Sequence, residues 1–198
     1  RDVYPHWVAN SMKLQALALK CNIEAARRSQ GIMGYDQWLL QDYWNGSNGV
    51  LDMFYRQKGS TASEFRKYNS PTVLLMDCAR RNYWCGETAK LTLSASRYED
   101  EPSDNAIFHW ELRAGKKVLE SGSKDHVRVG SNGLQELAVL SLKMPSVDKA
   151  AKLTFVAEIK DQNGKSANDW NFWVVPEDRR SPGARQLAII DCPPLDRL

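Results

Sequence analysis

The chain has 198 residues, of which 42% are hydrophobic and 26% are charged. This composition is typical of one globular domain, or of one domain with part of another. The net charge is only +3, with no block of lysines and arginines, so neither nucleic acid nor a membrane surface is predicted as a partner. No run of 18 apolar residues occurs, which excludes an ordinary transmembrane helix. The start, RDVYPHW, has no Met and no apolar run, so we expect a piece of a longer chain.

The first predicted element is a helix over residues 5–29. Pro5 suits the first turn, where its missing N–H is not needed, and Arg27 and Arg28 favour the negative end of the helix dipole. Apolar side chains repeat at steps of three and four and predict one buried stripe. The stripe consists of Val8, Met12, Ala16, Leu19, Ile23 and Ala26.

Residues 34–44, GYDQWLLQDYW, carry an unusual density of aromatic, amide and carboxylate side chains. The segment is short and is followed by the turn-forming NGSNG, so we predict a buried strand over residues 35–43. A short helix over residues 60–69 follows. Ser60 or Thr61 is its expected N-cap, with Glu64 near the capping-box position.

From Thr72 to residue 176 the pattern changes to short runs with period-two alternation, separated by turn signals. In KLTFVAEIK, Leu153, Phe155, Ala157 and Ile159 share one face. About seven such strands predict an immunoglobulin-like β-sandwich. Residues 177–198 resemble a linker followed by the stub of another domain.

The four cysteines and three histidines form no metal-binding or redox spacing. We interpret Cys21, Cys78, Cys85 and Cys192 as free thiols, with a Cys78–Cys85 bridge as the alternative. No cofactor and no metal are predicted. Glu24 and Glu64 are interpreted as solvated residues on helix faces.

The order of these pieces resembles the C-terminal part of family-2 glycoside hydrolases, the β-galactosidase and β-glucuronidase superfamily. Gly34, Trp38 and Asp42 are similar to the eighth strand of the catalytic (β/α)8 barrel in that family, and NDWNFWVVP, near residue 170, resembles the last strand of the sandwich that follows the barrel. The resemblance implies a mainly β chain, with an immunoglobulin-like sandwich preceded by a helix–strand–helix remnant of the barrel. Its domains would be residues 1–70, 71–176 and 177–198.

The resemblance also implies a carbohydrate substrate and four substrate-binding residues. They are Trp38, Gln41, Asp42 and Trp44, at the end of a barrel strand that faces the active site. Indoles stack on the C–H face of a sugar, while amides and carboxylates bind its hydroxyls. Asp42 has an alternative role as a brace of the barrel rim.

No catalytic residue is predicted within the chain, because the two glutamates of a retaining glycosidase are expected upstream of Arg1. The remainder of the barrel, in the same or another chain, is then the expected partner. By resemblance, a periplasmic or secreted location is possible. The alternative function is a non-catalytic sandwich that binds carbohydrate or protein, with Trp84, Trp110, Trp170 or Trp173 as sugar contacts. The first hypothesis expects residues 35–43 in a barrel-like sheet or exposed, and the second expects them within the sandwich.

Overall fold

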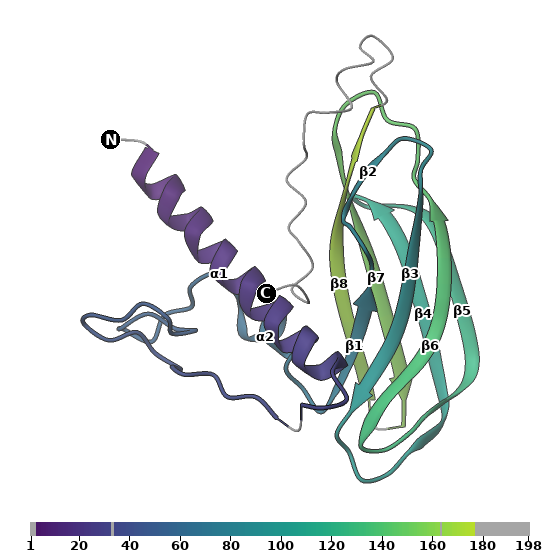
Figure 1. The fold of residues 1–198 in the computed structure, drawn as a ribbon, viewed down its shortest axis with the longest axis horizontal. Helices are drawn as coiled ribbons and strands as arrows, with labels where there is room; N and C mark the ends of the chain where they lie inside the picture. Colours follow the sequence, from purple (N-terminus) through teal and green to yellow (C-terminus); the bar gives the residue numbers. More distant parts are fainter. Residues whose placement is uncertain (1–2, 33, 163, 177–198) are drawn as a thin grey trace.

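The computed structural model describes residues 3–32, 34–162 and 164–176 of the chain. It is mainly β, as predicted, with two sheets that follow a long N-terminal helix (Figure 1). The helices are α1 (Val3–Arg28) and α2 (Ala62–Arg66). The strands are β1 (Thr72–Asp77), β2 (Asn82–Trp84), β3 (Thr88–Arg97), β4 (Ser103–Ala114), β5 (Lys117–Val129), β6 (Gly133–Lys143), β7 (Ala151–Asp161) and β8 (Gly164–Val175).

The strands form a two-sheet sandwich. One sheet has the order β1-β3-β6 and the other has the order β2-β8-β7-β4-β5. All neighbouring strands are antiparallel except β2 and β8, which are parallel. Strand β2 was not predicted, because three residues are too few to show an alternating pattern.

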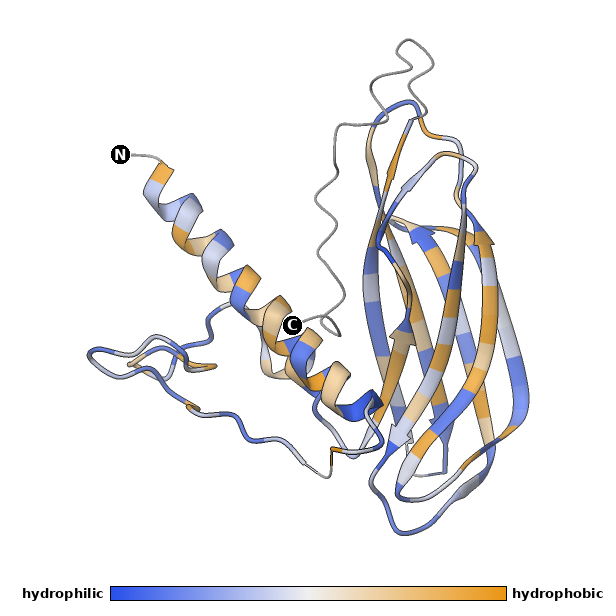
Figure 2. Ribbon diagram, in the orientation of Figure 1, coloured by the Kyte–Doolittle hydropathy of each residue, from blue (hydrophilic) through white to orange (hydrophobic). Residues whose placement is uncertain are grey.

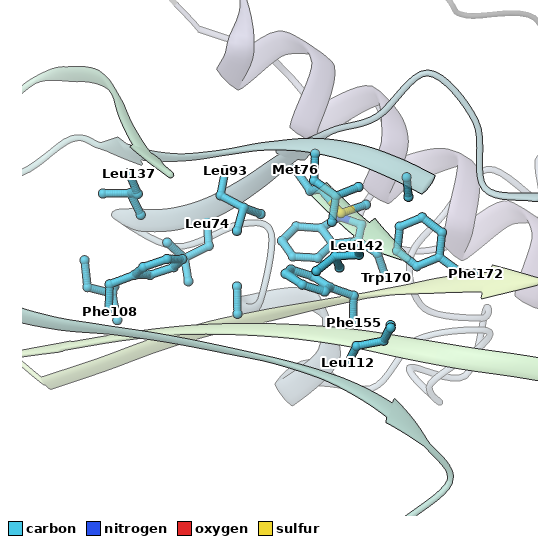
Figure 3. Packing of buried hydrophobic residues seen from close by; sticks show 14 of the residues in the cluster. Leu74, Met76, Leu93, Phe108, Leu112, Leu137, Leu142, Phe155, Trp170 and Phe172 are labelled. Carbon is cyan, nitrogen blue, oxygen red and sulfur yellow. The ribbon is translucent and has the colours of Figure 1, made fainter. Parts of the chain in front are cut away.

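The core of the sandwich is built from the inward-facing residues of both sheets. Figure 3 shows Phe108, Leu112 and Phe155 directed toward side chains of the opposite sheet. The four residues predicted to share a face of β7 are all at most 4% exposed. The Phe155 ring lies 5.8 Å from the Trp110 ring and 6.3 Å from the Trp170 ring, measured between centroids. Each such side chain stabilises the fold by roughly 1.5–3 kcal/mol through burial.

Helix α1 confirms the predicted stripe. Ile23 is buried, and the other five members are half-buried. A second apolar set on α1 is exposed, however, with 56–77% of each residue accessible. It consists of Val3, Tyr4, Trp7, Leu14 and Leu17. Figure 2 shows that apolar residues continue to the end of α1 that lies away from the sandwich.

The C-terminal half of α1 is fixed to the sandwich by a buried polar cluster. The Glu24 carboxylate accepts hydrogen bonds from Asn168 Nδ2 (2.8 Å) and Trp170 Nε1 (3.1 Å), both on β8. The interpretation of Glu24 as solvated is therefore wrong, because Glu24 packs against β8 and only 3% of the residue is exposed. Lys20 lies 3.6 Å from this carboxylate, and burial lowers the pKa of its ammonium group.

Arg27 makes a second set of contacts between α1 and the sandwich. Its guanidinium group donates hydrogen bonds to the carbonyl oxygens of Ser70 (2.7 Å), Pro71 (2.8 Å) and Ser96 (3.0 Å). These carbonyls belong to the chain just before β1 and to β3 itself. The helix therefore lies against the sheet edge at β1 (Figure 1).

The prediction of a buried strand over residues 35–43 is wrong. The segment is irregular, with isolated bridges from Gln41 to Leu51 and from Tyr43 to Gly46. Trp38 and Trp44 are 75% and 84% exposed. The physical reason is that a strand needs a neighbouring strand for its backbone groups, and no such strand lies beside this segment in the described part of the chain. The helix–strand–helix remnant is thus not confirmed, although the segment does stay outside both sheets.

Helix α2 begins as expected. Thr61 is its N-cap, its Oγ1 accepts from the Glu64 N–H (3.2 Å), and the Glu64 carboxylate accepts from the Thr61 N–H (2.8 Å). The Thr61 N–H and the Thr61 hydroxyl, which also donates to the Glu64 carboxylate (2.9 Å), lower the pKa of Glu64. The predicted linker and stub, 177–198, lie outside the described residues, and the division into domains stays a prediction.

Candidate functional site

The candidate site is the loop of residues 41–58, which is organised around one ion pair. Asp42 Oδ2 lies 2.9 Å from Lys58 Nζ, and both side chains are at most 15% exposed. Lys58 also donates to the carbonyl oxygens of Ser47 (2.9 Å) and Gly49 (3.0 Å). Asp42 Oδ1 accepts from the Gly49 N–H (2.7 Å). The pair therefore holds the second half of the NGSNG turn against Asp42 and Lys58.

Two glycines allow the close approach of backbone that this loop requires. A Cβ atom at Gly49 would overlap the backbone N of Asp42, and one at Gly59 would overlap the carbonyl oxygen of Met12 in α1. Gln15 of α1 adds hydrogen bonds to the carbonyl oxygens of Ser47 (3.2 Å) and Gly49 (3.3 Å). The loop is thus held against α1 at Met12 and Gln15, near the middle of the helix.

The loop surrounds an open hollow of about 550 Å³ with a mixed lining. The aromatic and apolar part consists of Tyr43, Trp44, Met53 and Phe54, and the polar part includes Asp42, Asn45, Ser47, Asp52 and Arg56. Rings beside amides, carboxylates and a guanidinium group can bind a ligand that has both C–H faces and hydroxyl groups. The size of the hollow lies in the range of small-ligand sites, roughly 300–1,000 Å³.

One wall of the hollow is a compact turn at Asp52. Its carboxylate accepts from the backbone N–H groups of Phe54 (2.8 Å) and Arg56 (2.9 Å), and from Arg56 Nε (2.7 Å). Desolvation acts to raise the pKa of Asp52, but the hydrogen bonds from Arg56 and Phe54 lower it below the usual value. The Arg56 guanidinium lies 5.0 Å from the Phe54 ring centroid. The Asp52 carboxylate is therefore ionised, and it already accepts hydrogen bonds from Phe54 and Arg56. The Phe54 ring and the Arg56 guanidinium group remain exposed to solvent.

The four residues predicted to bind substrate have different environments. Asp42 and Trp44 line the hollow. Gln41 Nε2 donates to the Met53 carbonyl (2.9 Å), and Trp38 is exposed near the start of the loop. Asp42 contacts Lys58 and Gly49 within its own loop, and its alternative role as a brace of the barrel rim stays a prediction. Substrate binding by Trp38, Gln41, Asp42 and Trp44 stays a prediction.

Sequence reasoning missed Asp52, Phe54 and Arg56 as residues of the hollow. The available signal was an acidic and a basic residue four positions apart around an aromatic pair, directly after a glycine-rich turn. No group of His, Cys, Asp or Glu suited to a metal ion occurs among the described residues. In the same part of the chain, no helix is long and apolar enough to cross a bilayer.

The cysteines in the described ranges are free thiols. Cys78 Sγ lies 3.3 Å from Tyr83 Oη, whereas Cys85 Sγ accepts from the Val147 N–H (3.2 Å). The alternative bridge between Cys78 and Cys85 is therefore not formed. Cys192 lies outside the described residues.

The tryptophans of the sandwich divide into two groups. Trp170 is buried, and Trp110 packs on Phe155 inside the sandwich. Trp84 is half-buried, and Trp173 is 49% exposed. Of the four residues considered as sugar contacts in the alternative hypothesis, Trp173 is the most exposed and Trp170 is buried, whereas Trp84 and Trp110 are intermediate.

Comparison with known proteins finds a solved structure that shares the fold of most of this chain. A family model described as "Domain of unknown function (DUF8488)" matches residues 87–176. No curated protein matches the chain. Among solved structures, the exo-chitosanase CsxA of Amycolatopsis orientalis aligns over 85% of this chain, with a TM-score of 0.61 and 15% identity. Most of the chain therefore shares its fold with one segment of that exo-chitosanase.

Other similar structures cover less of the chain. A β-glucuronidase of Parabacteroides merdae aligns over 52% of it, with a TM-score of 0.38 and 16% identity. The sporulation control protein Spo0M of Bacillus subtilis aligns over 55%, with a TM-score of 0.42 and 8% identity. The chain spans 14% of the β-glucuronidase, 51% of Spo0M and 19% of the exo-chitosanase.

Proposed function

We propose that this chain is the C-terminal part of a family-2-like glycoside hydrolase. In this proposal, residues 1–70 complete a (β/α)8 barrel, and residues 71–176 form an immunoglobulin-like sandwich that braces it. The catalytic glutamates of the retaining, double-displacement reaction lie outside the chain. The observation that carries the proposal is the alignment of 85% of the chain with one segment of an exo-chitosanase.

The two-sided apolar character of α1 supports the proposal. One face of the helix packs within the chain, while Val3, Trp7 and Leu14 on the other are exposed. A helix that is apolar on both sides is stable when both sides are covered. The rest of a barrel would cover the second side and would also supply the neighbour that residues 35–43 lack. Residues 35–43 lie outside both sheets and most of them are exposed, which is the outcome that the enzyme hypothesis expects.

The chemistry of the hollow gives the substrate-binding part of the proposal. Trp44 and Phe54 offer ring faces for a sugar, and Asp42 positions the turn that carries them through its bonds to Lys58 and Gly49. Trp38 contributes a further ring on the side that faces the barrel. The substrate class is a β-glycoside, and the residues of this chain bind and orient it.

The test starts with the coding sequence upstream of Arg1. We expect it to encode a barrel with a Glu shortly before Arg1 and an Asn-Glu pair further back. The protein that includes this region is then assayed on a panel of aryl β-glycosides. Trp38→Ala and Trp44→Ala should each lower kcat/KM at least about tenfold, because a lost contact of 1.4 kcal/mol has that effect.

The matched control is Trp173→Ala, which removes an exposed indole from the sandwich far along the chain. It should leave kcat/KM unchanged. An upstream sequence without a barrel would overturn the proposal. So would an active enzyme in which Trp38→Ala and Trp44→Ala behave like the control.

A further inference from the structure

We propose that the outer face of the five-stranded sheet binds an acidic polysaccharide through Trp84 and Trp173. This site lies on β2, β8 and β7, separate from the loop of residues 41–58, and it does not depend on the proposed glycosidase activity. The experiment below can therefore fail or succeed independently of that proposal.

The strand geometry brings the two indoles to one face. Trp173 lies between the buried residues Phe172 and Val174 of β8, so it points outward. Trp84 follows the buried Tyr83 in β2 and points to the same side. The parallel register places Trp84 opposite Val175, two residues beyond Trp173 on the neighbouring strand. Diagonal neighbours of this kind are within reach of long aromatic side chains.

Polar groups flank these rings at the positions where sugar hydroxyls would lie. Asn82 of β2 is opposite Trp173 on one side, and Lys152 of β7 is opposite it on the other. In the next row, Thr154 Oγ1 donates to Asn171 Oδ1 (3.3 Å). Two flat rings beside amides and a hydroxyl suit successive pyranose units of a chain.

The charge at this face selects an acidic ligand. Lys152 is exposed, and it makes no ion pair within the described residues. The acidic residues of β7 and β8 on this face are already paired, Glu158 with Lys165 (2.5 Å) and Asp169 with Lys67 (2.5 Å). A carboxylate or sulfate group on the sugar would therefore find an uncompensated ammonium group next to the ring of Trp173.

The experiment measures binding of the whole chain, residues 1–198, by isothermal titration calorimetry and affinity electrophoresis. The acidic probes are polygalacturonate and dextran sulfate, and the neutral probes are dextran and highly methyl-esterified pectin. We expect binding to an acidic probe that weakens as salt rises. Trp173→Ala should weaken it at least about tenfold, equivalent to 1.4 kcal/mol. Lys152→Glu should weaken it by a similar factor, and Trp173→Phe should retain most of it.

Trp7→Ala serves as the matched control, since it removes an exposed indole from α1, outside both proposed saccharide sites, and should leave binding unchanged. Circular dichroism verifies that each variant is folded. The proposal is overturned if neither acidic probe binds, if neutral dextran binds equally well, or if Trp173→Ala binds as the unmodified chain does. It is also overturned if Trp7→Ala weakens binding as strongly as Trp173→Ala.

Discussion

At the scale of single residues, buried polar groups define how the parts of the chain join. Glu24 has donors on both carboxylate oxygens, with Trp170 Nε1 3.1 Å from each and Asn168 Nδ2 2.8 Å from one. Lys20 completes the cluster and lies 5.2 Å from the Trp170 ring centroid. Removing one partner from such a cluster leaves the others buried without their hydrogen bonds, which costs far more than the net value of the pair.

We therefore predict that Glu24→Ala lowers the free energy of unfolding by about 3–5 kcal/mol. Glu24→Gln should cost less, because an amide oxygen can still accept from Trp170 or Asn168. Urea denaturation followed by tryptophan fluorescence measures both values. Glu120→Ala, at an exposed position on β5, is the matched control and should change stability by at most about 0.5 kcal/mol. A loss for Glu24→Ala as small as that of the control would contradict the role of the cluster.

At the scale of elements, local sequence signals and close packing act together. The α1 stripe and the capping box of α2 are local signals, and both formed as expected. The path of the chain between the two helices depends instead on contact with α1. Gly59 passes so close to the Met12 carbonyl of α1 that no side chain fits there.

Gly59→Ala should push the chain at residue 59 away from α1, because a Cβ there would overlap the Met12 backbone rather than a movable side chain. We expect a loss of about 1–3 kcal/mol, the usual cost of forcing an extra methyl group into a packed region. The loop should also become more dynamic, which hydrogen exchange of the Gly49 amide would report. Gly31→Ala is the control, because nothing lies within 4 Å of a Cβ there. Equal stability of the two variants would contradict the prediction, since it would show that the contact between residue 59 and Met12 adjusts without cost.

At the scale of the whole molecule, the sandwich and the N-terminal part of the chain differ in how completely they bury their apolar side chains. The sandwich closes a continuous core (Figure 3). The N-terminal part leaves a large apolar set exposed on α1 and in the loop, including Trp7, Leu14, Trp38 and Phe54. Soluble monomers rarely expose contiguous apolar patches beyond a few hundred Å² unless the patch binds something. Because of this contrast, we expect a protein surface, such as the rest of the proposed barrel, to cover the N-terminal part of the chain.

We predict that Trp7→Glu reduces self-association of the isolated chain and lowers its binding of the dye ANS. The reason is that Trp7, 64% exposed and stacked on Tyr4, is a central part of the apolar face of α1. The free energy of unfolding should change by at most about 0.5 kcal/mol, as for other exposed positions. Sedimentation velocity and ANS fluorescence are the measurements. Ser11→Glu adds the same charge at an exposed polar position and should have a smaller effect, and equal effects would contradict the prediction.

The fold was predictable to the extent that it depends on neighbours in sequence. The alternation that placed Leu153, Phe155, Ala157 and Ile159 on one face reflects the period of a strand, and it predicted the inner face of β7 correctly. The same logic predicted most other strands, both helices and an N-cap at Ser60 or Thr61, of which the structure has Thr61. Strand β2 was not predicted, because its three residues pair with β8, which is distant in sequence, and no local pattern encodes that partner.

The candidate site was predictable only in part, for the same physical reason. The sequence by itself determined the concentration of rings, amides and carboxylates in residues 34–44, and hence a ligand-binding or packing role for them. The tertiary structure decided that Asp42 pairs with Lys58, that Glu24 is buried, and that Trp173 is exposed while Trp170 is not. Each of these outcomes depends on which distant segment covers a side chain, because burial and pairing are properties of contacts between elements, and periodicity within one element does not specify them.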